Sequence, residues 1–235
     1  MKNILTIVKR EIYSMITTKV SYVVSGIFLL LVGWYFSKSM LIRNRADLDS
    51  VFSVIPFLFL FFIPAITMKS IAEEKKNGIM EQMLTFPVTD IQYILGKFLS
   101  AFIFLCMLLA STLFFYLSIE ILGEPDIGKI ISSYISAMFL GGALISIGLF
   151  ASSQSSDLVT SYIVSFSIMF MLYLADKVVH LMHFEIQNFV LYMSTDYHYR
   201  NMLRGIIDSR DIVYFISLMI LFLFLTARNL EKRKW

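Results

Sequence analysis

Three short stretches of this sequence contain residue types that carry out chemistry in other proteins. GEPDIGKI at 123–130 has the glycine and Gly-Lys spacing of a phosphate-binding loop. HLMHFE at 180–185 places two histidines and a glutamate within one helical turn or two, where side chains can share a metal ion. EEKKNGIMEQMLTFPVTDIQYILGK at 73–97 is a dense charged stretch between two apolar runs. The three patterns indicate nucleotide binding, metal binding and contact with a partner, respectively.

The first two stretches lack residues that their chemistry requires. Ile130 stands where a phosphate-binding loop has the Ser or Thr that binds Mg²⁺, and Glu124 and Asp126 would repel phosphate. His180, His183 and Glu185 of HLMHFE have no fourth ligand and no supporting second shell. We therefore expect a turn in the first stretch and interfacial histidines in the second. No catalytic, nucleotide-binding or metal-binding residue is expected in this chain, and no cofactor.

The amino-acid composition indicates whether the chain folds in water or in a membrane. Residues of the AVILMFWYC set make up 58% of the chain and charged residues 16%, whereas soluble domains average about 45–50% and about 25%. A spanning helix needs about 20 mostly apolar residues. Six stretches meet this requirement, at 20–41, 51–69, 95–120, 130–151, 158–182 and 211–227. The predicted fold class is therefore an all-α integral membrane protein with six transmembrane helices.

The segment before the first span differs from the rest. In residues 1–19 apolar side chains recur at helical spacing with Lys and Arg between them, which predicts an amphipathic helix lying at the membrane interface. Residues 20–235 then form one six-span domain. An even number of spans places both termini on one side, and that side holds more Lys and Arg than the other. The positive-inside rule predicts cytoplasmic termini in a bacterial inner membrane.

Local rules divide the charged stretch into three parts. The second transmembrane helix continues to Lys76, and Asn-Gly at 77–78 stops it, because Gly78 tolerates positive φ. A short helix follows at 79–84. Pro87 closes it, since a residue before proline leaves the helical region. Thr89 with Gln92 then forms a capping box that starts the next helix. We expect a cytoplasmic elbow at about 70–97 with a short crossing helix at its tip.

The short helix has an apolar side that needs a partner. Ile79, Met80, Met83 and Leu84 lie on one side, and Glu81 lies on the other. A helix of this length is unstable in water by itself, and an exposed apolar face is typical of an interaction surface. The alternative is a solvated hairpin tip without a partner.

The order of these parts resembles a known family. FFIPAITMKSIAEEKKNGIMEQMLTFPVTDIQYILGKFLSAF at 61–102, RGIIDSRDIVYFISLMILFLFLTARNLEKRKW at 204–235 and KRE at 9–11 are similar to the membrane subunits of type-2 ATP-binding-cassette exporters. Within that class the chain is most similar to the small gliding-motility and nitrous-oxide-reductase-maturation permeases.

The resemblance implies roles for the elbow and for the outer segment. It implies that the helix between spans two and three couples the permease to a separate ATPase subunit, which binds ATP and Mg²⁺. The matching or neighbouring positions are Glu73, Glu74, Gly78, Ile79, Met80, Glu81, Met83, Leu84, Pro87, Thr89 and Gly96. It also implies a second copy or paralogue of the permease as partner, no nucleic acid, and two short re-entrant outer helices at about 183–210.

Three functions compete on this reading. The first is an ATP-driven transporter permease, and the Ser and Thr residues of the fourth span, with few charged residues in any span, favour a lipidic or apolar substrate. The second is an intramembrane enzyme, which would need a nucleophile and base at one depth. The third is a mechanical or scaffold protein whose ATPase moves a partner protein instead of a solute.

Overall fold

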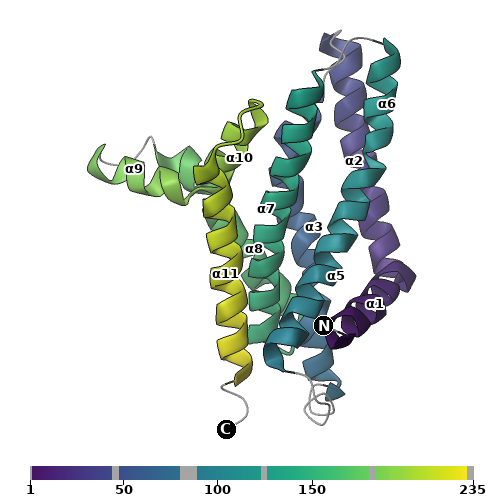
Figure 1. The fold of residues 1–235 in the computed structure, drawn as a ribbon, viewed down its shortest axis with the longest axis vertical. Helices are drawn as coiled ribbons and strands as arrows, with labels where there is room; N and C mark the ends of the chain where they lie inside the picture. The colour runs from purple at the N-terminus through teal and green to yellow at the C-terminus, as the bar shows by residue number, and fades with distance from the viewer. Residues whose placement is uncertain (1, 44–47, 80–88, 123–125, 180–183, 232–235) are drawn as a thin grey trace.

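The computed structural model describes residues 2–43, 48–79, 89–122, 126–179 and 184–231. These residues are mainly helical and contain no strand, which confirms the all-α prediction for this part of the chain. The helices, labelled as in Figure 1, are α1 (Lys2–Thr17), α2 (Lys19–Arg43), α3 (Asp49–Lys76), α5 (Asp90–Ser111), α6 (Leu113–Leu122), α7 (Ile127–Gln154), α8 (Leu158–Val178), α9 (Phe184–Met193), α10 (Thr195–Leu203) and α11 (Ser209–Glu231).

Six segments of the described chain are long and apolar enough to cross a membrane, as the sequence predicted. In chain order they are α2, α3, the joined pair α5–α6, α7, α8 and α11. The third of them is interrupted at Thr112, whose hydroxyl donates a hydrogen bond to the Leu109 carbonyl oxygen at 2.6 Å. The sequence predicted one continuous helix there, because neither proline nor glycine marks the break. The start of α1 and the end of α11 lie at the same end of the bundle (Figure 1).

Helix α7 is the centre of the bundle. In its apolar stretch 78% of the residues are buried, compared with 17% in α2, α8 and α11. Glycines let its neighbours approach closely, as small residues do between membrane helices. Gly141 faces Leu105 of α5 and Phe59 of α3, and Gly148 faces Thr67 of α3. The outer helices α2, α8 and α11 therefore leave most of their apolar surface outside the bundle.

Helix α1 is the amphipathic segment, and it lies at an angle across the first turns of α5 (Figure 1). The Ile7 and Val8 side chains of this helix are buried, whereas those of Leu5 and Tyr13 are exposed. A Cβ atom at Gly96 would lie 2.7 Å from Cγ2 of Ile7. Gly96 thus permits an approach of α1 to α5 that a larger residue would prevent.

Two short helices, α9 and α10, lie in the segment that the sequence predicts to be outside the membrane. Helix α10 packs against the bundle: the Tyr199 hydroxyl donates to the Phe52 carbonyl oxygen at 2.8 Å, and the Ser132 hydroxyl donates to the Met202 carbonyl oxygen at 2.6 Å. Helix α9 projects away from the bundle, across the direction of the spans (Figure 1). The two helices therefore differ in role, with α10 serving as part of the core.

Candidate functional site

The charged stretch begins and ends as its local sequence predicted. Helix α3 stops at Lys76, the Asn77 N–H bonds back to the Glu73 carbonyl oxygen, and Gly78 has φ +68°. Helix α5 starts after Thr89, whose side chain accepts from the Gln92 N–H at 3.3 Å while the Thr89 N–H donates to the Gln92 side chain at 3.4 Å. The helix stop and the capping box are both confirmed.

The tip of the elbow lies outside the described residues. This applies to the site residues Met80, Glu81, Met83, Leu84 and Pro87. Ile79 is the last described residue before them. The short crossing helix at 79–84 therefore stays a prediction. Residues 123–125, which begin the GEPDIGKI stretch, and the two histidines of HLMHFE also lie outside the described residues. The turn and the interfacial histidines therefore stay predictions as well.

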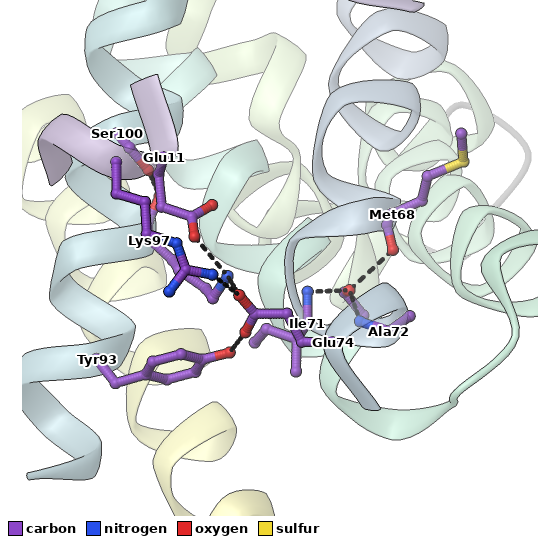
Figure 2. Close-up of polar contacts among 10 residues, drawn as sticks. Glu11, Met68, Ile71, Ala72, Glu74, Tyr93, Lys97 and Ser100 are labelled. Carbon is purple, nitrogen blue, oxygen red and sulfur yellow. Dashed lines mark hydrogen bonds and ion pairs between the residues drawn. The ribbon is translucent and has the colours of Figure 1, made fainter. Parts of the chain in front are cut away.

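A buried lysine joins three helices where the elbow leaves and re-enters the bundle. The Lys97 side chain on α5 is only 1% exposed, and its Nζ lies 3.2 Å from Glu11 Oε1 of α1 and 3.1 Å from Glu74 Oε1 of α3 (Figure 2). A lysine is rarely so buried unless it is paired. The sequence gives no local signal of this role, because Glu11 and Glu74 are far from Lys97 along the chain.

Glu74 completes this cluster from the other side. Its Oε2 accepts a hydrogen bond from the Tyr93 hydroxyl, and its Oε1 lies 3.6 Å from the Arg10 guanidinium. The resemblance implied a contact between Glu74 and a partner ATPase, whereas the described carboxylate is bonded inside this chain and is 10% exposed. Its neighbour Glu73 is partly exposed. Glu74 thus positions helices, and Glu73 is the better placed of the two for an outside contact.

A second polar contact fixes α3 to α7. The Ser152 hydroxyl oxygen accepts from the backbone N–H groups of Ile71 at 3.1 Å and Ala72 at 3.0 Å, and it donates to the Met68 carbonyl oxygen at 3.0 Å (Figure 2). A serine hydroxyl has one donor and two acceptor sites. All of them are therefore used on α3, within its last three turns.

Ser153, the residue after Ser152, connects α11 to the same end of α7. The Asn229 amide donates to the Ser153 carbonyl oxygen at 2.7 Å and to its hydroxyl at 2.9 Å, and Lys75 Nζ also donates to that carbonyl. Together with the Lys97 cluster these contacts form a polar layer, which we define as Glu11, Glu74, Lys97, Ser152, Ser153 and Asn229. The layer joins α1, α3, α5, α7 and α11 at the end of the bundle that carries the elbow.

Asp157 caps the first turn of α8 next to this layer. Its carboxylate accepts from the Thr160 N–H and hydroxyl, both at 2.9 Å. The hydrogen bond from the Thr160 backbone N–H, followed by the one from its hydroxyl, lowers the pKa of Asp157. Its role is therefore that of a helix cap.

The opposite end holds charged contacts that sequence analysis did not predict. Asp196 on α10 is 2% exposed and lies 2.9 Å from both Lys177 Nζ and Arg200 Nε. His198 Nδ1 lies 2.6 Å from Asp211 Oδ1, and its Nε2 lies 3.0 Å from the Tyr192 carbonyl oxygen. Only the Asp196–Arg200 spacing of four residues was visible as a local signal. Both ring nitrogens of His198 are occupied, so this pair supports α9, α10 and α11 and offers no free base.

These features define a multi-pass membrane protein with a polar layer beneath a displayed elbow. A family model described as ABC-2 family transporter protein matches residues 46–227. The match covers most of the chain, and the chain belongs to this family. It is thus a permease component of an ATP-binding-cassette transporter, and the family implies an ATP-binding-cassette ATPase as partner. No curated protein matches the chain.

Proposed function

We propose that this chain couples ATP hydrolysis by a separate ATPase subunit to the export or movement of a substrate through residues 77–88. The observation that carries this proposal is the polar layer. It holds both ends of the elbow, the end of α3 and the start of α5, to three other helices. A displacement of the tip would thus move several helices together, because interfaces packed in this way shift as units.

The proposal places the parts as follows. The end of the bundle with the elbow faces the cytoplasm of a bacterial cell, where the ATPase holds ATP and Mg²⁺. A second permease, identical or paralogous, completes the transporter. Ile79, Met80 and Met83 supply the buried anchor against the ATPase, and Glu81 offers charge-assisted hydrogen bonds to its basic groups.

We propose a lipidic or apolar substrate. In α7, the most buried span, the hydroxyls of Ser133, Ser136 and Ser146 donate to carbonyl oxygens of their own helix at 2.6–2.8 Å. The O–H donors of these serines are therefore used within the helix and are not free to bind an anionic solute.

Met83→Asp tests the docking assignment. We expect it to weaken binding of the ATPase by about 2 kcal/mol or more, roughly thirtyfold, because an anchor residue would become a desolvated charge. The measurement is co-purification of the ATPase with the full-length permease, beside size-exclusion chromatography of the permease alone. Met193→Asp on α9 is the matched control, since it makes the same change at the opposite end. Undiminished recovery of the ATPase with Met83→Asp would show that the docking face is wrongly assigned.

Thr89→Ala tests coupling without touching that face. Loss of an N-cap costs about 0.5–2 kcal/mol, so the start of α5 should fray while the bundle stays folded. We expect an assembled complex in which substrate-stimulated ATP hydrolysis or transport is reduced. Asp126→Ala, which removes the side-chain cap of α7 at the other end, should have no such effect. A complex that dissociates would place Thr89 in the docking surface, and unchanged transport would mean that the cap plays no part in coupling.

A further inference from the structure

A cavity of about 300 Å³ lies between α1, α2 and the last turns of α3, next to the polar layer. Its polar side is lined by charged and hydroxyl-bearing residues, which include Arg10, Ser14, Lys69, Ser70, Glu73 and Glu74. Its apolar side is formed by Met15, Val20, Val24, Ala65 and Ile66. The cavity is therefore amphipathic and sits where the apolar part of the bundle meets its polar end.

Three groups in this cavity have no partner in the described structure. Lys69 and Glu73 lie one turn apart on α3, and neither forms an ion pair with a described residue, whereas Glu74 and Lys97 beside them are fully paired. Ser70 lies between them in sequence and is 6% exposed, and its buried Oγ has no hydrogen-bond partner. A buried polar atom without a partner is uncommon in native proteins and points to a bound group. The Lys69 ammonium, the Glu73 carboxylate and the Ser70 hydroxyl are thus available to bind a ligand.

The charges of the lining select among ligands. Three cations, Arg10, Lys69 and Lys97, balance three carboxylates, Glu11, Glu73 and Glu74. An anionic ligand would meet all three carboxylates, and a cationic one would meet the three cations. A zwitterion leaves the balance intact and can use Lys69 and Glu73 together. Next to the cavity, α2 exposes Tyr22, Val23 and Ile27 in a spanning segment. The acyl chains of a lipid bound in the cavity could pack against these side chains.

We propose that the cavity binds the headgroup of a zwitterionic phospholipid with a primary ammonium, of the phosphatidylethanolamine type. The phosphate binds Lys69 and the Ser70 hydroxyl, and the ammonium donates to Glu73. A phosphatidylcholine headgroup cannot do this, because its quaternary ammonium has no N–H donor. The bound lipid would link α1 and α2 to the end of α3, and the inference does not depend on the ATPase assignment.

Lipid-dependent stability of the purified full-length chain tests the proposal. In a neutral detergent, phosphatidylethanolamine should raise Tm more than phosphatidylcholine or phosphatidylglycerol of the same acyl chains, and native mass spectrometry should show it bound. Glu73→Gln should lower the affinity for phosphatidylethanolamine about tenfold or more, the change for losing one charge-assisted hydrogen bond of about 1.5 kcal/mol or above, and should remove its advantage over phosphatidylcholine. Lys69→Gln should weaken all three lipids, since they share the phosphate.

A matched control variant and two further measurements complete the test. Lys76→Gln changes an exposed charge on the same helix outside the cavity and should leave the lipid preference unchanged. Ser70→Ala is a milder variant that keeps the fold if a charge variant does not, and it should weaken all three lipids. Free phosphoethanolamine in place of lipid should give no rise in Tm. Equal stabilisation by the three lipids, or a preference that survives Glu73→Gln, would overturn the proposal.

Discussion

Lys97→Met is expected to lower the free energy of unfolding by about 3–5 kcal/mol, the usual cost of removing one partner from a buried ion pair. The substitution keeps the length of the side chain but removes the charge that Glu11 and Glu74 share. Glu74 keeps the Tyr93 hydroxyl and the more distant Arg10, whereas Glu11 loses its only ion pair among the described residues. The loss should therefore fall mainly on the contact of α1 with α5.

A double-mutant cycle separates this charge effect from packing. Equilibrium unfolding in mixed detergent micelles, followed by circular dichroism, gives the free energies. Glu11→Gln in the Lys97→Met background should recover part of the stability, because the stranded carboxylate is gone. Lys19→Met, a charge removal on the more exposed start of α2, is the control and should change the free energy by less than about 0.5 kcal/mol. A Lys97→Met protein as stable as the parent would mean that the cluster contributes nothing to stability.

Gly148→Ala should destabilise the bundle by about 3 kcal/mol, the upper end of the range for overpacking a tight core. A Cβ atom there would lie 2.1 Å from Oγ1, 2.8 Å from Cβ and 3.1 Å from Cγ2 of Thr67. Rotation of the Thr67 side chain cannot relieve the contact, because its Cβ does not move. Helices α3 and α7 must therefore separate, and the Ser152 bonds to α3 lie one turn further along.

Gly26→Ala is the matched control for this substitution. Nothing lies within 4 Å of a Cβ at Gly26, so the same change on α2 should be neutral or should stabilise by about 0.5–1 kcal/mol through helix propensity. Thr67→Ala in the Gly148→Ala background removes two of the three close atoms and should recover part of the loss. The same unfolding measurement serves all three variants. If Gly148→Ala matched Gly26→Ala, the contact between α3 and α7 would have to be looser than described.

Much of this protein follows from its sequence alone, because the determining interactions are local. The length and composition of the apolar runs predict six spans, since a bilayer sets the length of a helix. The Asn-Gly pair at Gly78 predicts where α3 ends, and the Thr89–Gln92 spacing predicts where α5 begins, because these signals act within one turn. The family resemblance at 61–102 came from the same run of residues, and the match over 46–227 shows it.

The tertiary structure decided what the charged residues do. Glu73 and Glu74 are adjacent and chemically identical, and both line the amphipathic cavity, yet only Glu74 is bonded to Lys97 and Tyr93. Helix geometry turns successive residues by about 100°, and only the packing of α1 and α5 determines which direction is buried.

The polar layer was hidden for the same reason. Members of the layer contact residues 19 to 86 positions away, such as Glu74 with Tyr93 and Glu11 with Lys97, and no local rule relates such positions. Gly148 and Thr67 likewise carry no mark of their contact in the sequence. Sequence determined the helices and their ends through interactions within a few residues. The site depended on which helix faces meet, and that is set by the packing of the whole bundle.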